Sequence, residues 1–345
     1  MNVGKEAKIY WISILQGWSM LLVVIGHVTL TNIFENPATP VSTEVERIIY
    51  GFHMPLFMFI SGGLFYYTKI RKGKKYGVTI RDKAKRLLAP FIFFTLATFA
   101  LKYIFNPLMK RPVELSFKQI INSVLYPASN PLGEMWFIIT LFIIFLFYPV
   151  FKWSLQWNKC IVSVWITALL LNLFFPKDIE ILCFSQVAYY LVYFYSGLLF
   201  FKFDAYKYTD TKCFFVVSLM FFVLFNILVL PVIFLTFTGI AFSVALCLLL
   251  SHYWIRLFSS FRDYTFQIFL MGLFFQMGIR FLYAKLDNEL LYWPLYVLSI
   301  LLALYMPVLI SKMIQKIESP FIHQCFVTIL FSATPILSAV FQPIK

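Results

Sequence analysis

The chain has 345 residues, of which 61% are hydrophobic, 20% aromatic and only 13% charged. A water-soluble core of this size could not hide so much apolar surface, so the composition excludes an ordinary soluble domain. The net charge of +14 is spread over the segments between apolar runs, a pattern that argues against a nucleic-acid partner. We therefore predict an all-α polytopic membrane protein.

Apolar runs long enough to span hydrocarbon recur along the whole chain. They predict a bundle of about ten transmembrane helices, at residues 10–31, 47–68, 87–106, 131–151, 160–176, 181–201, 213–230, 235–254, 264–284 and 291–313. The first run is too long for a signal-peptide core and lacks a cleavage site of small residues. Without an internal repeat, the series favours one membrane domain over residues 1–345. The apolar segment 320–345 is open to three topologies: interfacial, re-entrant, or an eleventh span.

The charges predict the orientation of these spans. If the N-terminus is cytoplasmic, most of the 29 basic residues fall in inner segments, above all between Lys69 and Arg86. The outer segments then hold acidic residues such as Glu35, Glu44 and Glu46. This asymmetry follows the positive-inside rule, so we expect a cytoplasmic N-terminus.

The second predicted span, which contains FHMPLFMFISG, holds an ionisable residue, His53, and a helix breaker, Pro55. Pro55 removes the helical hydrogen bond to the carbonyl of Gly51, so the helix should kink or end there. A freed carbonyl beside a histidine is expected to line a polar cavity rather than to face lipid.

The predicted topology puts five polar or amphipathic side chains near the outer ends of four helices: His27, His53, Glu134, Trp136 and Arg280. Ionisable groups inside spans are costly and are candidates for function. Each also has an ordinary interpretation. The histidines could only join helices by hydrogen bonds, the charged groups could extend to lipid headgroups, and the tryptophan could belong to the aromatic belt.

A basic segment, RDKAKRLLAP, lies on the predicted inner side. Arg81, Lys85 and Arg86 have the spacing of one side of a helix, and arginine forks suit phosphate groups. The alternative is a solvated charge run that only sets topology. Because Pro90 is expected in a first helical turn, a helix should begin near Arg86.

Four segments in order carry a resemblance to a known family: WISILQGWSMLLVVIGH, FHMPLFMFISGGLF, RDKAKRLLAP and EMWFIITL. They resemble the acyltransferase 3 family of bacterial integral-membrane O-acyltransferases, and the second is most similar to the fucose 4-O-acetylase-like branch. The family's first helix usually carries an aspartate, then a basic residue before a glycine, then a histidine. Here Ser13 and Gln16 stand at the first two positions, while Gly17 and His27 are kept.

The resemblance implies a multi-pass enzyme of the bacterial inner (plasma) membrane. It would move an acetyl or similar short acyl group from cytoplasmic acyl-CoA to a hydroxyl of a cell-surface or lipid-linked sugar. Acetyl-CoA would be the co-substrate, without a metal. The partners would be membrane lipids, acyl-CoA and the glycan acceptor.

Acyl transfer to a hydroxyl needs a base and a group that holds the oxyanion. We expect His27 to be the general base, and His53 to orient it, donate to the oxyanion or bind the acceptor. The other expected roles are donor binding by Arg81, Lys85, Arg86 and Gln16, and substrate binding by Glu134, Trp136 and Arg280. Gln16 can hydrogen-bond a pantetheine amide but cannot neutralise a phosphate.

Two other functions stay open. A secondary transporter or flippase for a small anion or a lipid-linked sugar would use His27, His53 and Arg280 as substrate or proton-relay groups. However, the middles of the predicted helices are mostly apolar, whereas a transporter places polar groups at the midplane. A non-catalytic scaffold is favoured by Gln16 and disfavoured by the clustered polar groups.

Overall fold

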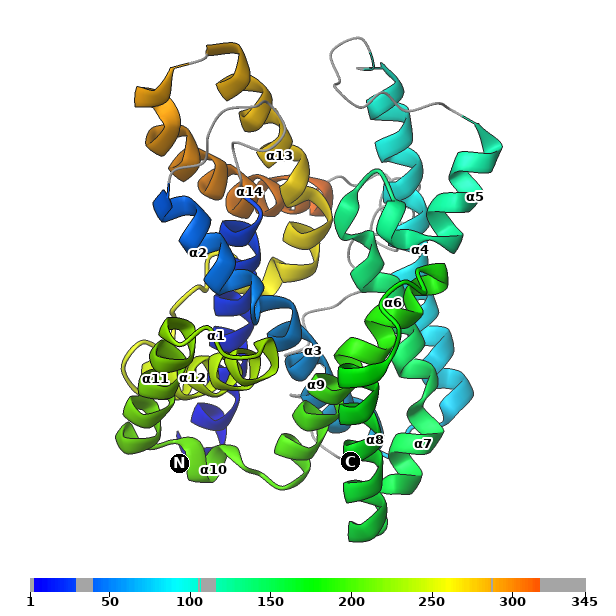
Figure 1. Cartoon of the computed structure of the whole chain (residues 1–345), viewed down its shortest axis with the longest axis vertical. Coiled ribbons are helices and arrows are strands. Elements are labelled where there is room, and N and C mark those ends of the chain that lie inside the picture. The colour runs from blue at the N-terminus through cyan, green and yellow to red at the C-terminus, as the bar shows by residue number, and fades with distance from the viewer. Residues whose placement is uncertain (1–2, 29–39, 105, 107–115, 287, 317–345) are drawn as a thin grey trace. The chain divides into compact units, whose positions relative to one another are not determined.

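The computed structural model describes residues 3–28, 40–104, 106, 116–286 and 288–316, with side chains from residue 10 onward. Every regular element in these ranges is a helix (Figure 1). Within the same ranges, six helices are long and apolar enough to cross a membrane, or seven if the bent pair Gly133–Leu146 and Tyr148–Ser154 is one span. The prediction of a multi-pass helical membrane protein is confirmed.

Each predicted span overlaps a helix or a helix pair of the described chain. Three of them are matched by shorter apolar helices: Tyr10–Gly26, Asn158–Phe174 and Lys212–Ile227. The number of ten spans and the cytoplasmic N-terminus stay predictions, as does the single domain. The segment 320–345 lies outside the described residues.

The described residues form two compact units. The first takes its residues from Met1–Ile60 and Phe200–Glu318, and the second from Ser61–Leu199. In both units the apolar runs are helical because a backbone that meets lipid must satisfy its hydrogen bonds within the segment.

In the first unit, α1 packs against α2, α12 and α13, while α11 pairs with α12 and α13 pairs with α14 (Figure 1). The buried ring of Trp11 stacks on Phe201 near the start of α1. The elements are α1 (Val3–Gly26), α2 (Pro40–Tyr50), α3 (His53–Phe65) as far as Ile60, α10 (Tyr206–Thr209), α11 (Lys212–Ile227), α12 (Val232–Tyr253), η6 (Arg262–Tyr264), α13 (Thr265–Leu286), η7 (Glu289–Leu291) and α14 (Tyr292–Gln315).

The second unit has an aromatic core in which the rings of Phe65, Phe145 and Phe194 contact one another. Gly62 of α3 permits this packing, because a Cβ atom there would lie 1.9 Å from the carbonyl oxygen of Phe194. Besides the end of α3, the elements are η1 (Tyr66–Ile70), α4 (Tyr76–Ile104), α5 (Phe117–Leu125), η3 (Pro127–Ser129), η4 (Gly133–Met135), α6 (Trp136–Leu146), α7 (Tyr148–Ser154), α8 (Asn158–Phe174), η5 (Ile181–Cys183) and α9 (Phe184–Lys202) as far as Leu199.

The expected helix start near Arg86 is wrong. Helix α4 begins at Tyr76 and continues through Pro90, which is buried. The stretch before the proline is rich in Lys, Arg, Ala and Leu, which favour helix, so the helix propagates up to it. One missing N–H costs less than ending the helix, and membrane helices tolerate such prolines where neighbours cover them.

Candidate active site

The second predicted span is broken where the sequence indicated. Helix α2 ends at Tyr50 and α3 begins at His53, which puts Pro55 in the first turn of α3, where its missing N–H costs little. The carbonyl of Gly51 accepts a 2.6 Å hydrogen bond from the hydroxyl of Thr236 on α12. A side chain of a neighbouring helix therefore satisfies this carbonyl, and the cavity expected for that purpose is not needed.

His53 is buried at the break, with 1% of its surface exposed. Its Nδ1 lies 2.9 Å from the carbonyl oxygen of Ile49. A carbonyl only accepts, so Nδ1 carries the proton and Nε2 of the neutral ring is an acceptor. Nε2 is buried without a hydrogen-bond partner among the described residues. The break therefore presents one imidazole of fixed tautomer to its surroundings.

Three rings meet beside the break. The ring centroids of His27 and His53 are 5.6 Å apart, and Tyr50 lies 5.4 Å from His27 and 5.0 Å from His53. The Tyr50 hydroxyl is 2.9 Å from His27 Nδ1. Sequence reasoning missed Tyr50, although it lies only three residues before His53.

Helix α13 holds the end of α1 in place. Arg280 donates from Nη2 to the backbone carbonyl of His27, and Gln276 donates to the carbonyl of Val24 at 2.8 Å. These two side chains lie four residues apart on α13 and bind carbonyls that the helix end leaves without intrahelical partners. A cation at a helix C-terminus also interacts favourably with the helix dipole. Gln276 is a second residue that sequence reasoning missed.

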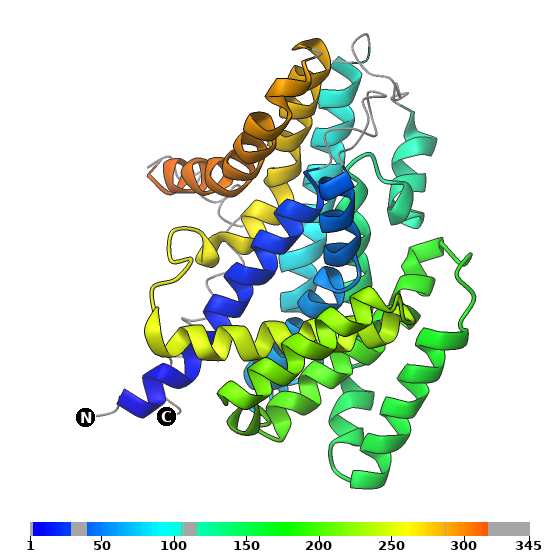
Figure 2. The same ribbon diagram turned by 60° about the vertical axis from the view of Figure 1, so that its left-hand side comes forward.

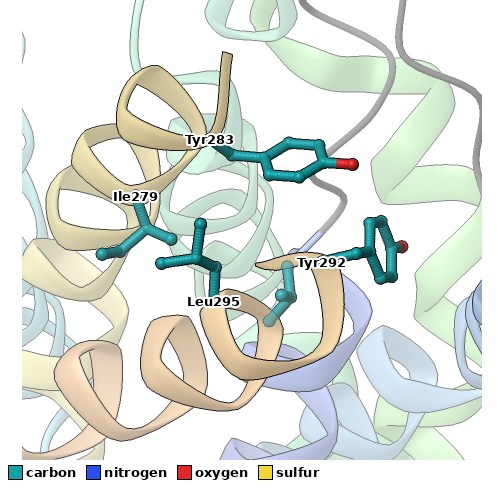
Figure 3. Close-up of a cluster of buried hydrophobic side chains, with 5 residues drawn as sticks. Ile279, Tyr283, Tyr292 and Leu295 are labelled. Atoms are coloured by element: carbon teal, nitrogen blue, oxygen red, sulfur yellow. The ribbon is translucent and has the colours of Figure 1, made fainter. Parts of the chain in front are cut away.

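A buried apolar cluster supports the same end of α1. Figure 3 shows Ile279 and Tyr283 of α13 facing Tyr292 and Leu295 of α14. Val28, the neighbour of His27, belongs to this cluster. Because Ile279 precedes Arg280, the cluster fixes the backbone on both sides of the hydrogen bond from Arg280 to His27.

The second unit holds two more predicted residues. Glu134 lies in η4, and Trp136 begins α6, where its ring stacks on Tyr190 of α9 at 5.3 Å. The preceding loop is tied to α4, since Asn130 donates to Thr95 at 2.9 Å. Trp136 therefore follows a loop that is tied to α4, and its ring has an aromatic neighbour.

The basic segment lies on α4 in the second unit, as the spacing predicted. Arg81 and Lys85 are exposed and Arg86 is half-buried. Sequence reasoning missed Lys83, whose Nζ lies 3.9 Å from the centroid of the Phe145 ring. This contact is a cation–π interaction between a half-buried lysine and the aromatic core.

The structure thus brings together three of the predicted site residues, His27, His53 and Arg280, in the first unit. Gln16 is half-buried on α1, eleven residues before His27. The other predicted residues belong to the second unit, and their roles stay predictions. In the described part of the chain, no group of His, Cys, Asp or Glu residues could hold a metal ion.

Comparison with known proteins assigns the chain to a family. A family described as "Acyltransferase domain" matches residues 9–312. The nodulation protein NolL of Mesorhizobium japonicum is 30% identical over 151 residues, which cover 44% of this chain and 36% of that protein. The NolL protein of Sinorhizobium fredii is 32% identical over 93 residues, 27% of this chain and 25% of that protein. The chain thus matches about a third or less of the length of these relatives, and no solved structure matches it.

Proposed function

Because the chain belongs to the acyltransferase 3 family, we propose that it is an O-acyltransferase that moves a short acyl group, such as acetyl, from acyl-CoA to a sugar hydroxyl. The acceptor would be a cell-surface or lipid-linked glycan, and the enzyme would act in the bacterial inner membrane. The observation that carries the proposal is the contact of His27, Tyr50 and His53 at the interrupted span.

His27 is the proposed general base. His27 is half-buried, whereas His53 is buried. Tyr50, the hydrogen-bond partner of His27, is 46% exposed. An acceptor hydroxyl would therefore reach His27 more readily than His53. If His27 donates from Nδ1 to the tyrosine oxygen, Nε2 is left as the basic atom. That nitrogen would take the proton of the hydroxyl as its oxygen attacks the thioester carbonyl. The thiolate of CoA would then leave and take up a proton.

His53 has a supporting role in this scheme. Its Nδ1–H is committed to the carbonyl of Ile49, so its free Nε2 accepts hydrogen bonds. An acceptor atom beside His27 stabilises the imidazolium that forms when His27 is protonated. Arg280, bound to the His27 backbone, fixes the position of the base and adds a positive charge near the developing oxyanion.

The donor and acceptor would use different surfaces. Arg81 and Lys85 are exposed cations on one helix, which suits the phosphate groups of acyl-CoA at the cytoplasmic side. The stacked rings of Trp136 and Tyr190 would offer an apolar face to a sugar. Glu134, at the same loop, would accept hydrogen bonds from sugar hydroxyls.

The test is transfer kinetics with purified protein in nanodiscs, comparing wild type with His27→Gln and His53→Gln. Glutamine can keep the hydrogen bond to Ile49 at position 53, but it cannot act as a base at either position. We expect His27→Gln to lower kcat by about 10²–10⁴-fold with unchanged binding of acetyl-CoA, and His53→Gln to lower it less. A His27→Gln enzyme with wild-type kcat would refute the assignment of the base.

The same preparation separates this function from the transporter alternative. An acyltransferase consumes acetyl-CoA and releases free CoA thiol, whereas a transporter or flippase moves its substrate unchanged. Wild-type protein that moves a lipid-linked sugar without releasing thiol would favour the alternative.

A further inference from the structure

A buried arginine lies in the first unit, away from the histidine cluster. Arg262 begins η6 between α12 and α13, and only 9% of its surface is exposed. Its Nη1 donates to the carbonyls of Ile255 and Leu257, both at 3.0 Å. Its Nε is buried with no hydrogen-bond partner in the described chain. The described residues therefore satisfy the guanidinium only in part.

The charge of Arg262 has no carboxylate counterpart among the residues that the structure describes. No carboxylate of the described residues lies within ion-pair distance of it, including the exposed neighbour Asp263. The other nearby charges are Arg256, in the same segment, and Lys312, whose Nζ lies 5.9 Å from the Tyr264 ring; both are exposed and positive. A desolvated cation without an anion is costly, so the burial of Arg262 favours an anionic ligand beside it.

The position of Arg262 along α1 is well defined. The segment after α12 runs alongside α1 before α13 begins (Figure 2), and η6 contacts α1. The backbone N–H of Arg262 donates to the carbonyl of Phe258 at 2.8 Å, and the Cβ of Phe258 would lie 2.7 Å from a Cβ atom at Gly17. Only glycine permits this approach, which sets Arg262 beside the middle of α1.

The neighbouring face of α1 carries a second unused polar group. Ser13 lies one turn before Gly17, on the same helical face. It is 1% exposed, and its hydroxyl has no hydrogen-bond partner in the described chain. Phe258 adopts a positive φ of 59°, which bulky residues rarely do. The strained backbone at Phe258 thus lies between the buried Arg262 and the face of α1 that carries Ser13.

We propose that Arg262 binds a phosphate group in the first unit, at a site additional to the basic segment of α4. The planar fork of arginine suits phosphate, and the free Nε offers a donor beside those that hold Ile255 and Leu257. The phosphate belongs either to the acyl donor or to an anionic lipid headgroup. The first source rests on the proposed function. His27 lies ten residues after Gly17, about 15 Å along the helix axis, so an extended donor bound at Arg262 would lie along α1 toward the base.

The test uses full-length wild type, Arg262→Gln and Arg256→Gln in phosphatidylcholine nanodiscs. Three probes are compared: acetyl-CoA, acetyl-pantetheine without phosphates, and phosphatidylglycerol retained in native mass spectrometry. We expect Arg262→Gln to weaken at least one phosphate ligand by about tenfold or more and to leave acetyl-pantetheine unchanged. Arg256→Gln, an exposed arginine of the same segment, controls for charge. The ligand that is lost identifies the source of the phosphate.

Binding of acetyl-CoA and phosphatidylglycerol to Arg262→Gln as to wild type would overturn the proposal, as would binding of neither to wild type. If Arg262→Gln does not fold, Arg262→Lys takes its place, because lysine keeps the charge but lacks the planar fork. An Arg262→Lys variant that binds acetyl-CoA and phosphatidylglycerol as tightly as wild type would also overturn the proposal. If wild type transfers acetyl groups, and the Arg262 variants bind acetyl-CoA and phosphatidylglycerol as wild type does, only the site at Arg262 is refuted. If wild type does not bind acetyl-CoA, and Arg262→Gln binds less phosphatidylglycerol than wild type, the acyl-CoA donor alone is refuted.

Discussion

Removal of one hydroxyl tests the arrangement around His27. In Tyr50→Phe the ring contacts with both histidines stay, and the 2.9 Å hydrogen bond to His27 Nδ1 is lost. A hydrogen bond between neutral groups contributes about 0.5–1.5 kcal/mol net, and the 46% exposure of Tyr50 puts this one in the lower half of that range. We therefore expect kcat/KM for the acceptor to fall about two- to fivefold.

Tyr50→Ala extends the same argument. It also removes two edge-to-face contacts, each worth about 0.5–1.5 kcal/mol. The loss then totals about 1.5–4 kcal/mol, or about ten- to several-hundredfold in kcat/KM.

The assay is steady-state transfer from acetyl-CoA, with KM for the donor measured separately. Because Tyr50 acts through His27, we expect kcat to fall while KM for acetyl-CoA stays unchanged. Tyr253→Phe, at the exposed end of α12, is the matched control. Equal kinetics of Tyr50→Phe and wild type would show that the tyrosine does not position the base. A change in donor KM alone would point to a general distortion.

Two further substitutions test the helix break in the first unit and the aromatic core of the second unit. Thr236→Val removes the donor to the carbonyl of Gly51 at the helix break, so we expect the free energy of unfolding to fall by about 1–3 kcal/mol and Tm in detergent to be lower. The control is Thr238→Val, which should change Tm less because the Thr238 hydroxyl donates only within α12. Gly62→Ala places a methyl group 1.9 Å from the backbone oxygen of Phe194, so we expect a loss of about 3 kcal/mol or more, or no folded protein. Gly77→Ala meets no atom within 4 Å and should retain the wild-type Tm. Equal Tm values within either pair would contradict the corresponding contact.

The sequence indicated the helices well, because their main determinant is the length of an apolar run. It also located the interruption at Pro55. The predicted topology put His27, His53, Arg280, Glu134 and Trp136 at one level; the structure brings the first three together in one unit, and the level itself stays a prediction. The failure at Pro90 has a physical reason: a proline inside a long helix is tolerated when neighbouring residues cover it, and this packing is not visible in one sequence.

The residues that sequence reasoning missed act through their neighbours. Tyr50 and Gln276 are ordinary residues of helices, and they matter because one meets His27 and the other the carbonyl of Val24. Arg256 and Arg262 are basic residues of the same segment between α12 and α13, yet Arg262 is buried and Arg256 is exposed. Charge counting treats the two alike, and only the path of the segment along α1 separates them.

Acyl transfer with His27 as the base is tested most directly by a labelling experiment. Purified protein is given 14C-labelled acetyl-CoA and host membranes, and the label is measured in the glycan and lipid-linked fractions. We expect label in one of these fractions with wild type. We expect His27→Gln to lose at least about 99% of that rate under conditions where both proteins bind acetyl-CoA equally. Wild-type protein that binds acetyl-CoA but transfers no label, or a His27→Gln variant that transfers at the wild-type rate, would contradict acyl transfer with His27 as the base.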